Sequence, residues 1–285
     1  MSLDYQTLMN WPFKACTRTY DRADSIRIAQ GFGAGVDPDW SSIDRRYIED
    51  TPALTSLPMS AVALADGEFW QQDPRSGIVW QQMVHAQESL RVHQPLPLAG
   101  SVVITQKVRD LFDRGPDKGA VMVQEQLLSD PQGNPLVSIE VTTVLRGNGG
   151  FGGEPQPHLR PEAIPDRTPD ATLYVRTPEG ADTMFRLSAN IAVAARAQAD
   201  TQRYMLRGLG CFGLAGRGAL KLACDNEPDR LLAIGVRYAG PMLTSETMRI
   251  DLWHARPGFA LFKMHACERD MPVLSHGYVE FAPAA

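Results

Sequence analysis

A stretch rich in glycine and proline constrains the fold most, because it divides the chain into two halves of similar pattern. Residues 146–169 read RGNGGFGGEPQPHLRPEAIPDRTP, with neither the period of a helix nor that of a strand. Such composition is typical of a loop or linker. We therefore predict an N-terminal domain over residues 1–148, a linker over 149–169 and a C-terminal domain over 170–285.

Each half has a helical stretch followed by a run of strands. In the strands, apolar residues recur with the period of an extended chain, and clusters of turn-forming residues separate them. The expected strands lie at 101–110, 120–128 and 136–145 in the first half, and at 231–238, 247–253, 260–268 and 273–281 in the second. A further extended segment is expected between His85 and His93.

The expected helices lie at 57–69 and 206–224. The second reads LRGLGCFGLAGRGALKLAC, and its five glycines each cost ~1 kcal/mol of helix stability relative to alanine. This cost indicates close packing against a sheet, or backbone that is exposed to a ligand. We predict two α+β units in which an antiparallel sheet covers a helix. The two sheets could pair at their edges into one continuous sheet, which would protect those edges.

Charge and composition exclude several classes of function. The net charge is −5 with no block of like charges, so the basic surface of a nucleic-acid-binding protein is not expected. No stretch approaches the length of an apolar membrane span, and residues 1–16 have no apolar run that resembles a signal peptide. The spacing of the cysteines fits neither a zinc site nor a disulfide framework. We expect a cytoplasmic protein with free thiols, no metal and no cofactor.

Six segments together resemble the MaoC-like, type-2 (R-specific) 2-enoyl-CoA hydratases, a unit that is also found in peroxisomal multifunctional enzymes. They are VHAQESLRVHQPLP at 84–97, RGNGGFGG at 146–153, PDRTPDA at 165–171, FRLSAN at 185–190, LRGLGCFGLAGR at 206–217 and YVEFAP at 278–283. The resemblance covers essentially the whole chain. It implies a tandem double hot-dog fold, in which each domain is a long helix wrapped by an antiparallel sheet.

The resemblance also implies a reaction, the reversible addition of water to a trans-2-enoyl-CoA that gives a (3R)-hydroxyacyl-CoA. A CoA thioester would then be the substrate or ligand. The chemistry needs an acid/base pair that moves the proton of water, and N–H groups that stabilise the charge on the thioester oxygen. Family members carry the acid/base pair in a motif of the form S-G-D-x-N-P-x-H.

This motif is degenerate here. Asn190 stands where the family has its aspartate, residues 191–195 directly after it include no histidine, and the segment from Ser188 to Gly208 is shorter than in the family. An amide cannot accept a proton near neutral pH, and losing a positioned acid/base group typically costs ~10²–10⁴ in rate. We therefore predict weak or altered activity, with hydration of crotonyl-CoA very slow or undetectable.

Three residues near this motif are candidates for the site. Gly208 occupies the family's oxyanion position, and its backbone N–H is the expected donor. Arg207 replaces the preceding histidine, and it would either bind a carboxylate or phosphate or simply pack its stem while its charge reaches solvent. Asp200 is either a relocated base or a carboxylate in an exposed loop or helix cap.

Other candidates lie in the linker and in the first half. Gly150, Phe151 and Gly152 either approach the CoA moiety closely or belong to a flexible linker. Glu88 is interpreted as a residue that supports packing or pairing. All the histidines are interpreted as surface residues or as satisfied ones.

Three hypotheses remain open. The chain is an acyl-CoA-handling enzyme with altered chemistry or an unusual substrate, or a non-catalytic acyl-CoA-binding or scaffold subunit that pairs with an active hydratase, or an ordinary hydratase with a lineage-specific deletion. We expect a homodimer, or a hetero-oligomer with an active hydratase, and neither a nucleic acid nor a membrane as a partner.

Overall fold

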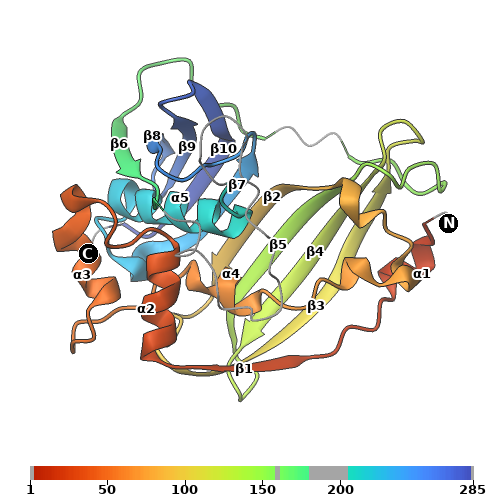
Figure 1. Ribbon diagram of the computed structural model, residues 1–285, viewed down its shortest axis with the longest axis horizontal. Helices are drawn as coiled ribbons and strands as arrows, with labels where there is room; N and C mark the ends of the chain where they lie inside the picture. Colours follow the sequence, from red (N-terminus) through yellow and green to blue (C-terminus); the bar gives the residue numbers. More distant parts are fainter. Residues whose placement is uncertain (1–2, 158–160, 180–204, 284–285) are drawn as a thin grey trace.

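The computed structural model describes residues 3–157, 161–179 and 205–283. Its strands form a single antiparallel sheet of ten strands in the order β1-β3-β4-β5-β2-β7-β10-β9-β8-β6 (Figure 1). The first half of the chain supplies β1 (Cys16–Tyr20), β2 (Met83–Val92), β3 (Gly100–Asp113), β4 (Ala120–Ser129) and β5 (Pro135–Leu145). The second half supplies β6 (Ala171–Arg176), β7 (Leu231–Tyr238), β8 (Thr247–Arg256), β9 (Phe259–Ala266) and β10 (Met271–Phe281).

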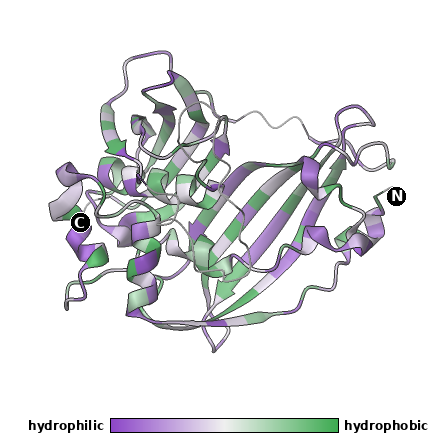
Figure 2. Ribbon diagram, viewed as in Figure 1, coloured by the Kyte–Doolittle hydropathy of each residue, from purple (hydrophilic) through white to green (hydrophobic). Residues whose placement is uncertain are grey.

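Every strand predicted from the alternation of apolar residues is present, with ends that shift by a few residues. Figure 2 shows this alternation along the long strands of the first half. The two strands that the sequence analysis did not predict, β1 and β6, form the edges of the sheet. Both are short and largely exposed, so they lack the buried apolar residues on which the prediction depends.

The two halves meet where β2 pairs with β7. Their antiparallel register runs from Gln87 opposite Arg237 to Arg91 opposite Ala233. An ion pair between Arg91 and Glu280, at 2.9 Å, spans the same joint. The expected continuous sheet is therefore confirmed, and the α+β fold with it, while the exact domain boundaries stay a prediction.

The long helix of the second half, α5 (Gly208–Ala223), is largely buried. Its glycines allow the close packing that the sequence predicted. A Cβ atom added at Gly213 would lie 2.0 Å from the ring of Phe32, and one at Gly216 would lie 2.5 Å from the side chain of Met59. The sequence predicts that these glycines pack against a sheet, and in the structure helices of the first half also pack against α5.

The helix expected at 57–69 is short. Its regular part is α4 (Ser60–Ala65), whose residues are all buried, and it ends at Asp66. The remaining helices of the described chain were not predicted, because they are short or weakly amphipathic. They are α1 (Tyr5–Met9), α2 (Arg22–Gly31) and α3 (Ser41–Ile48), with 3-10 turns at Pro38–Trp40, Trp70–Gln72, Pro74–Ser76, Trp80–Gln82 and Pro228–Arg230.

One hydrophobic core joins the halves. Its buried residues run from Tyr20 in β1 to Val279 in β10, and they include much of α4 and α5. A buried ion pair of 2.5 Å between Arg217 and Asp44 fixes α5 to α3, and the Arg217 guanidinium lies 4.9 Å from the centre of the Trp40 ring. Among the described helices, none has the length and apolar character needed to cross a bilayer.

Candidate functional site

Two of the predicted site residues, Asn190 and Asp200, lie outside the described residues. Their roles stay predictions. The others fall in two separate places, the start of α5 and the loop that follows β5.

The start of α5 holds Arg207 and Gly208. Arg207 is the N-cap residue, but its side chain makes no capping hydrogen bond. Instead its Nη1 lies 3.2 Å from a carboxylate oxygen of Asp66, just beyond the end of α4. The first N–H groups of a helix have no partner within it, and the helix dipole makes that end favourable for negative charge. The predicted oxyanion role of Gly208 is compatible with this position.

The loop with Gly150, Phe151 and Gly152 contacts the end of β3 and helix α1. The backbone N–H groups of Gly150 and Gly152 donate to the carboxylate of Asp113 at 2.8 and 2.7 Å. Both glycines have a positive φ, which explains why glycine occupies these positions. The Phe151 ring stacks against Tyr5. The predicted contact of this loop with CoA stays a prediction, although both N–H groups already have an acceptor.

A group of protic side chains lies beside the start of α5, at the joint between the halves. We define the protic cluster as His85 and Glu88 of β2 together with Tyr238 of β7. The Tyr238 hydroxyl lies 2.8 Å from Glu88 Oε2 and 3.0 Å from the backbone oxygen of Gly208. His85 packs against Tyr238 with ring centres 4.8 Å apart. The cluster therefore depends on both halves of the chain.

Gly208 is in direct contact with this cluster. A Cβ atom at position 208 would lie 3.3 Å from His85 Nδ1 and 3.5 Å from the Tyr238 hydroxyl. The lack of a side chain at Gly208 thus leaves room for both rings against the first turn of α5. The start of a helix, a carboxyl group, an imidazole and a phenol come together at this point.

Burial sets the charge states of the cluster. Desolvation raises the pKa of Glu88 from 4.5 to about 7, while the hydrogen bond from Tyr238 opposes the rise. Desolvation lowers the pKa of His85 from 6.5 to about 4, against the effect of a hydrogen bond to the Gln87 backbone. Burial, and then the charge of Glu88, raise the pKa of Tyr238. Near pH 7, His85 and Tyr238 are neutral and Glu88 is divided between its two forms.

His85 Nε2 and Glu88 Oε2, two polar atoms of the cluster, are not hydrogen-bonded to each other. His85 Nε2 is buried, and within the described chain it has no hydrogen-bond partner. It lies 3.7 Å from Glu88 Oε2, which is too long for a hydrogen bond. The His85 side chain is one-third exposed, whereas that of Glu88 is 1% exposed. Of these two side chains, only that of His85 therefore reaches the surface.

The sequence alone predicts packing or surface roles for Glu88 and His85 and gives no functional prediction for Tyr238. One signal was available. Successive side chains of a strand point to opposite faces, and Glu88 has the same parity in β2 as Leu90, which is fully buried. A carboxylate on the core face of a strand is unusual. Its proximity to Gly208 could not be inferred, because it depends on the pairing of β2 with β7.

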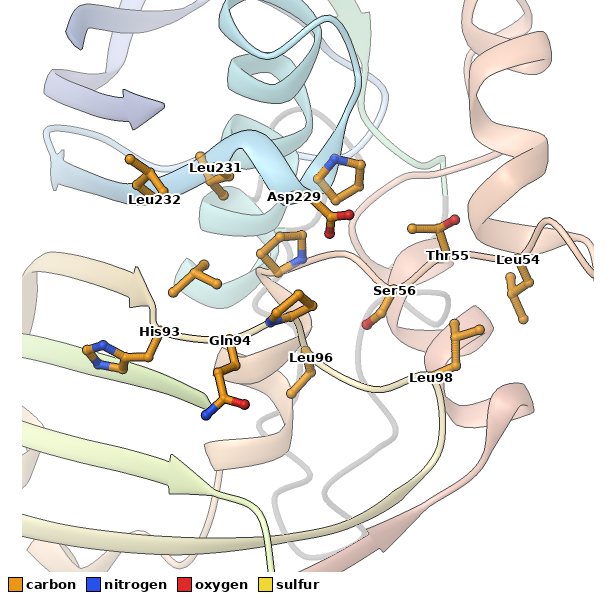
Figure 3. Close-up of a pocket in the computed structure, with 14 residues that line it drawn as sticks. Leu54, Thr55, Ser56, His93, Gln94, Leu96, Leu98, Asp229, Leu231 and Leu232 are labelled. Carbon is orange, nitrogen blue, oxygen red and sulfur yellow. The ribbon is translucent and has the colours of Figure 1, made fainter. Parts of the chain in front are cut away.

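A cavity of about 310 Å³ lies at the other end of β2 (Figure 3). Its lining includes Leu54, Leu96, Leu232 and the polar residues His93 and Asp229. His93 is eight residues from His85, which corresponds to about 26 Å along an extended strand. The cavity is therefore separate from the protic cluster. No group of residues suited to bind a metal ion occurs within the described ranges.

Comparison with known proteins identifies similar chains. No protein-family model matches the chain. It is 30% identical, over 90% of its length and 91% of the relative's, to a protein named 3-hydroxyacyl-thioester dehydratase Y from Mycobacterium tuberculosis. It is 30% identical to a probable enoyl-CoA hydratase 2 from Dictyostelium discoideum, with 70% of each chain covered. The crystal structure of a MaoC-like dehydratase from Phytophthora capsici superposes with a TM-score of 0.82, over 99% of this chain and all of the other, at 23% identity.

Proposed function

The chain belongs to the MaoC-like hydratase/dehydratase family of double hot-dog proteins, and from this we propose that it binds an acyl-CoA thioester and catalyses weak or altered hydratase/dehydratase chemistry. The reaction class is the interconversion of a trans-2-enoyl-CoA and a (3R)-hydroxyacyl-CoA. It uses the thioester as substrate and needs no cofactor. The cytoplasmic location and the homodimer predicted from the sequence are part of the same proposal.

The position of Gly208 carries this proposal. Gly208 begins α5, in contact with the rings of His85 and Tyr238. As water adds to an enoyl thioester, negative charge develops on the thioester oxygen, and a helix N-terminus favours such charge without rearrangement. Protic side chains within a few ångströms of that end are placed to handle the accompanying proton.

The expected rate is low because Asn190 stands at the position of the family aspartate and residues 191–195 after it contain no histidine. An oxyanion site can still provide residual catalysis when the usual acid and base are missing. The same loss favours the alternative function, a non-catalytic acyl-CoA-binding or scaffold subunit that pairs with an active hydratase. Both functions predict binding of an acyl-CoA thioester, but only the first predicts that the thioester is converted to product.

One titration separates them. The purified protein is titrated with crotonyl-CoA and (3R)-hydroxybutyryl-CoA by calorimetry, and turnover is followed by loss of the enoyl absorbance. Binding with slow, protein-dependent turnover is the expected result. Binding without turnover favours the scaffold function, and the absence of both contradicts either function. A rate equal to that of a family member with the intact motif contradicts the predicted loss of activity.

A further inference from the structure

The protic cluster is buried, titratable and in contact with the start of α5. A buried carboxyl group that is not held by a cation needs a reason to persist, because its ionised form is costly. No cation is hydrogen-bonded to Glu88 within the described chain. Its hydrogen-bond partner is the Tyr238 hydroxyl, and the charges of Arg207 and Asp66, which act on it in opposite directions, pair with each other.

We infer that Glu88 is the proton-transfer group of this chain, that His85 Nε2 orients the water molecule that reacts, and that Tyr238 is a positioning residue for the Glu88 carboxyl. The inference rests on the proposed function, since it assigns the acid/base step of that same site. It gives this chain an acid/base pair on β2, away from the degenerate motif at Asn190.

The contacts of Tyr238 suit both protonation states of Glu88. A phenol has one proton to donate, but the Tyr238 hydroxyl has two oxygens within hydrogen-bond distance. When Glu88 is ionised, Tyr238 donates to its carboxylate. When Glu88 is protonated, its carboxyl can donate to the Tyr238 oxygen while Tyr238 donates to the backbone oxygen of Gly208. In both states Tyr238 and Glu88 remain hydrogen-bonded to each other, so Glu88 can gain or lose its proton through reorientation of the hydroxyl hydrogens alone.

The position of His85 supplies the second requirement. The backbone hydrogen bond at Gln87 and the unpartnered Nε2 assign the ring proton to Nδ1 and the lone pair to Nε2. Nε2 and Glu88 Oε2 are 3.7 Å apart, a separation that one water molecule beside both atoms can bridge. That water would donate to both atoms, which leaves the lone pairs of its oxygen free to attack.

The step balances with water and the thioester alone. The oxygen of water bonds to Cβ of the enoyl group as one O–H bond breaks, and its proton passes to the Glu88 carboxylate. The π-electron pair between Cα and Cβ moves to form an enolate, whose oxygen lies at the start of α5. The carboxyl group then returns the proton to Cα, so the carboxylate and the thioester carbonyl are restored.

A pair of isosteric variants tests the assignment. Glu88→Gln keeps the shape of the side chain but replaces the carboxyl group with an amide, which cannot accept and return a proton. Glu140→Gln is the matched control, because Glu140 lies on the neighbouring strand opposite Ser89, where it pairs with Arg109. Two reactions are followed in each protein: hydration of crotonyl-CoA, and exchange of the Cα protons of butyryl-CoA in D₂O by mass spectrometry. The second requires proton transfer but no addition of water.

We expect Glu88→Gln to lower the rate of Cα proton exchange by ~10²–10⁴, with the Kd for butyryl-CoA unchanged and Glu140→Gln equal to the unsubstituted protein. Exchange that persists in Glu88→Gln overturns the inference, and so does an unsubstituted protein with no exchange. Exchange that depends on Glu88 without any hydration supports the inference and contradicts the proposed reaction, so the two failures are distinguishable.

The role of Tyr238 has its own readout. The groups that face Glu88 are His85 on β2, Tyr238 on β7, Cys211 on α5, and the Arg207–Asp66 pair. Because the Tyr238 hydrogen bond favours the carboxylate, Tyr238→Phe should move the pH at which exchange reaches half its maximum upward. A Tyr238→Phe variant that is slower but has an unshifted pH profile would reduce Tyr238 to a packing role and overturn this part of the inference.

Discussion

At the scale of single residues, the important fact is that Glu88 is placed where a carboxylate is least stable. Its side chain lies on the core face of β2, and burial raises its pKa to about 7. A glutamine would fill the same volume at this position without the cost of burying an ionisable group. The presence of Glu88 beside His85 and Gly208 is therefore more informative than that of any surface carboxylate.

The raised pKa of Glu88 makes stability depend on pH in a defined direction. The folded protein holds the proton more tightly than the unfolded chain, so the contribution is complete below about pH 4.5 and is lost as pH rises through about 7. The loss is on the order of 3 kcal/mol. The Glu88→Gln variant has no carboxyl group at this position and should not show this loss. Between pH 4.5 and 7.5, its free energy of unfolding should therefore rise relative to that of the unsubstituted protein.

Urea unfolding of both proteins at several pH values measures this difference. His85 acts in the opposite direction, since its pKa is lowered to about 4 and stability falls as pH drops below 6.5. This contribution is common to both proteins, so it largely cancels from the difference. Parallel stability curves for the two proteins would mean that Glu88 is ionised in the folded state at every pH above 5.

At the scale of elements, α5 has two kinds of glycine. Gly208 lies in its half-buried first turn beside the protic cluster, whereas Gly213 and Gly216 lie against Phe32 and Met59. The first leaves space at a site, and the other two allow elements of the first half to approach the helix axis. Sequence alone presents them as one glycine-rich segment.

Alanine substitution should separate the two kinds. In Gly213→Ala the new methyl group would overlap the Phe32 ring at 2.0 Å, and overpacking of this kind typically costs about 1–3 kcal/mol. In Gly208→Ala the closest contact is 3.3 Å to His85 Nδ1, so stability should change little while turnover falls. Urea denaturation and the Cα exchange assay measure the two effects. Equal losses of stability would refute the distinction.

At the scale of the whole molecule, the two halves share one sheet and one core. The β2–β7 pairing joins the strands of both halves into one sheet. The main hydrophobic cluster contains residues of both halves, and α5 packs against residues of the first half. A domain with its own complete core can fold by itself. A smaller cluster around Trp70 and Met122 belongs to the first half alone, but the larger cluster needs both halves, so neither half has a complete core.

We therefore expect a single unfolding transition. Trp253 lies in the second half, while Trp40 and the other tryptophans lie in the first. Because Trp40 packs against Arg217 of α5, both Trp40 and Trp253 are replaced by phenylalanine. Fluorescence of the remaining tryptophans then reports on the first half, while circular dichroism reports on the whole sheet. The two probes should give the same urea midpoint. Separate midpoints would show that the halves unfold independently.

The sequence by itself determined the strands of both halves, the glycine-rich helix and the family. These depend on local periodicity and on segments that recur in a fixed order, so no tertiary contact is needed to recognise them. It also located Gly208, because that glycine belongs to a recognisable motif.

Only the tertiary structure decided which side chains surround Gly208. Glu88 and Tyr238 are far apart in the chain and become neighbours through the register of β2 against β7. Their protonation follows from burial, which is a property of the packed molecule and of no single segment. The sequence could therefore predict that the family's acid/base pair is missing, but not that another protic pair lies beside the same helix.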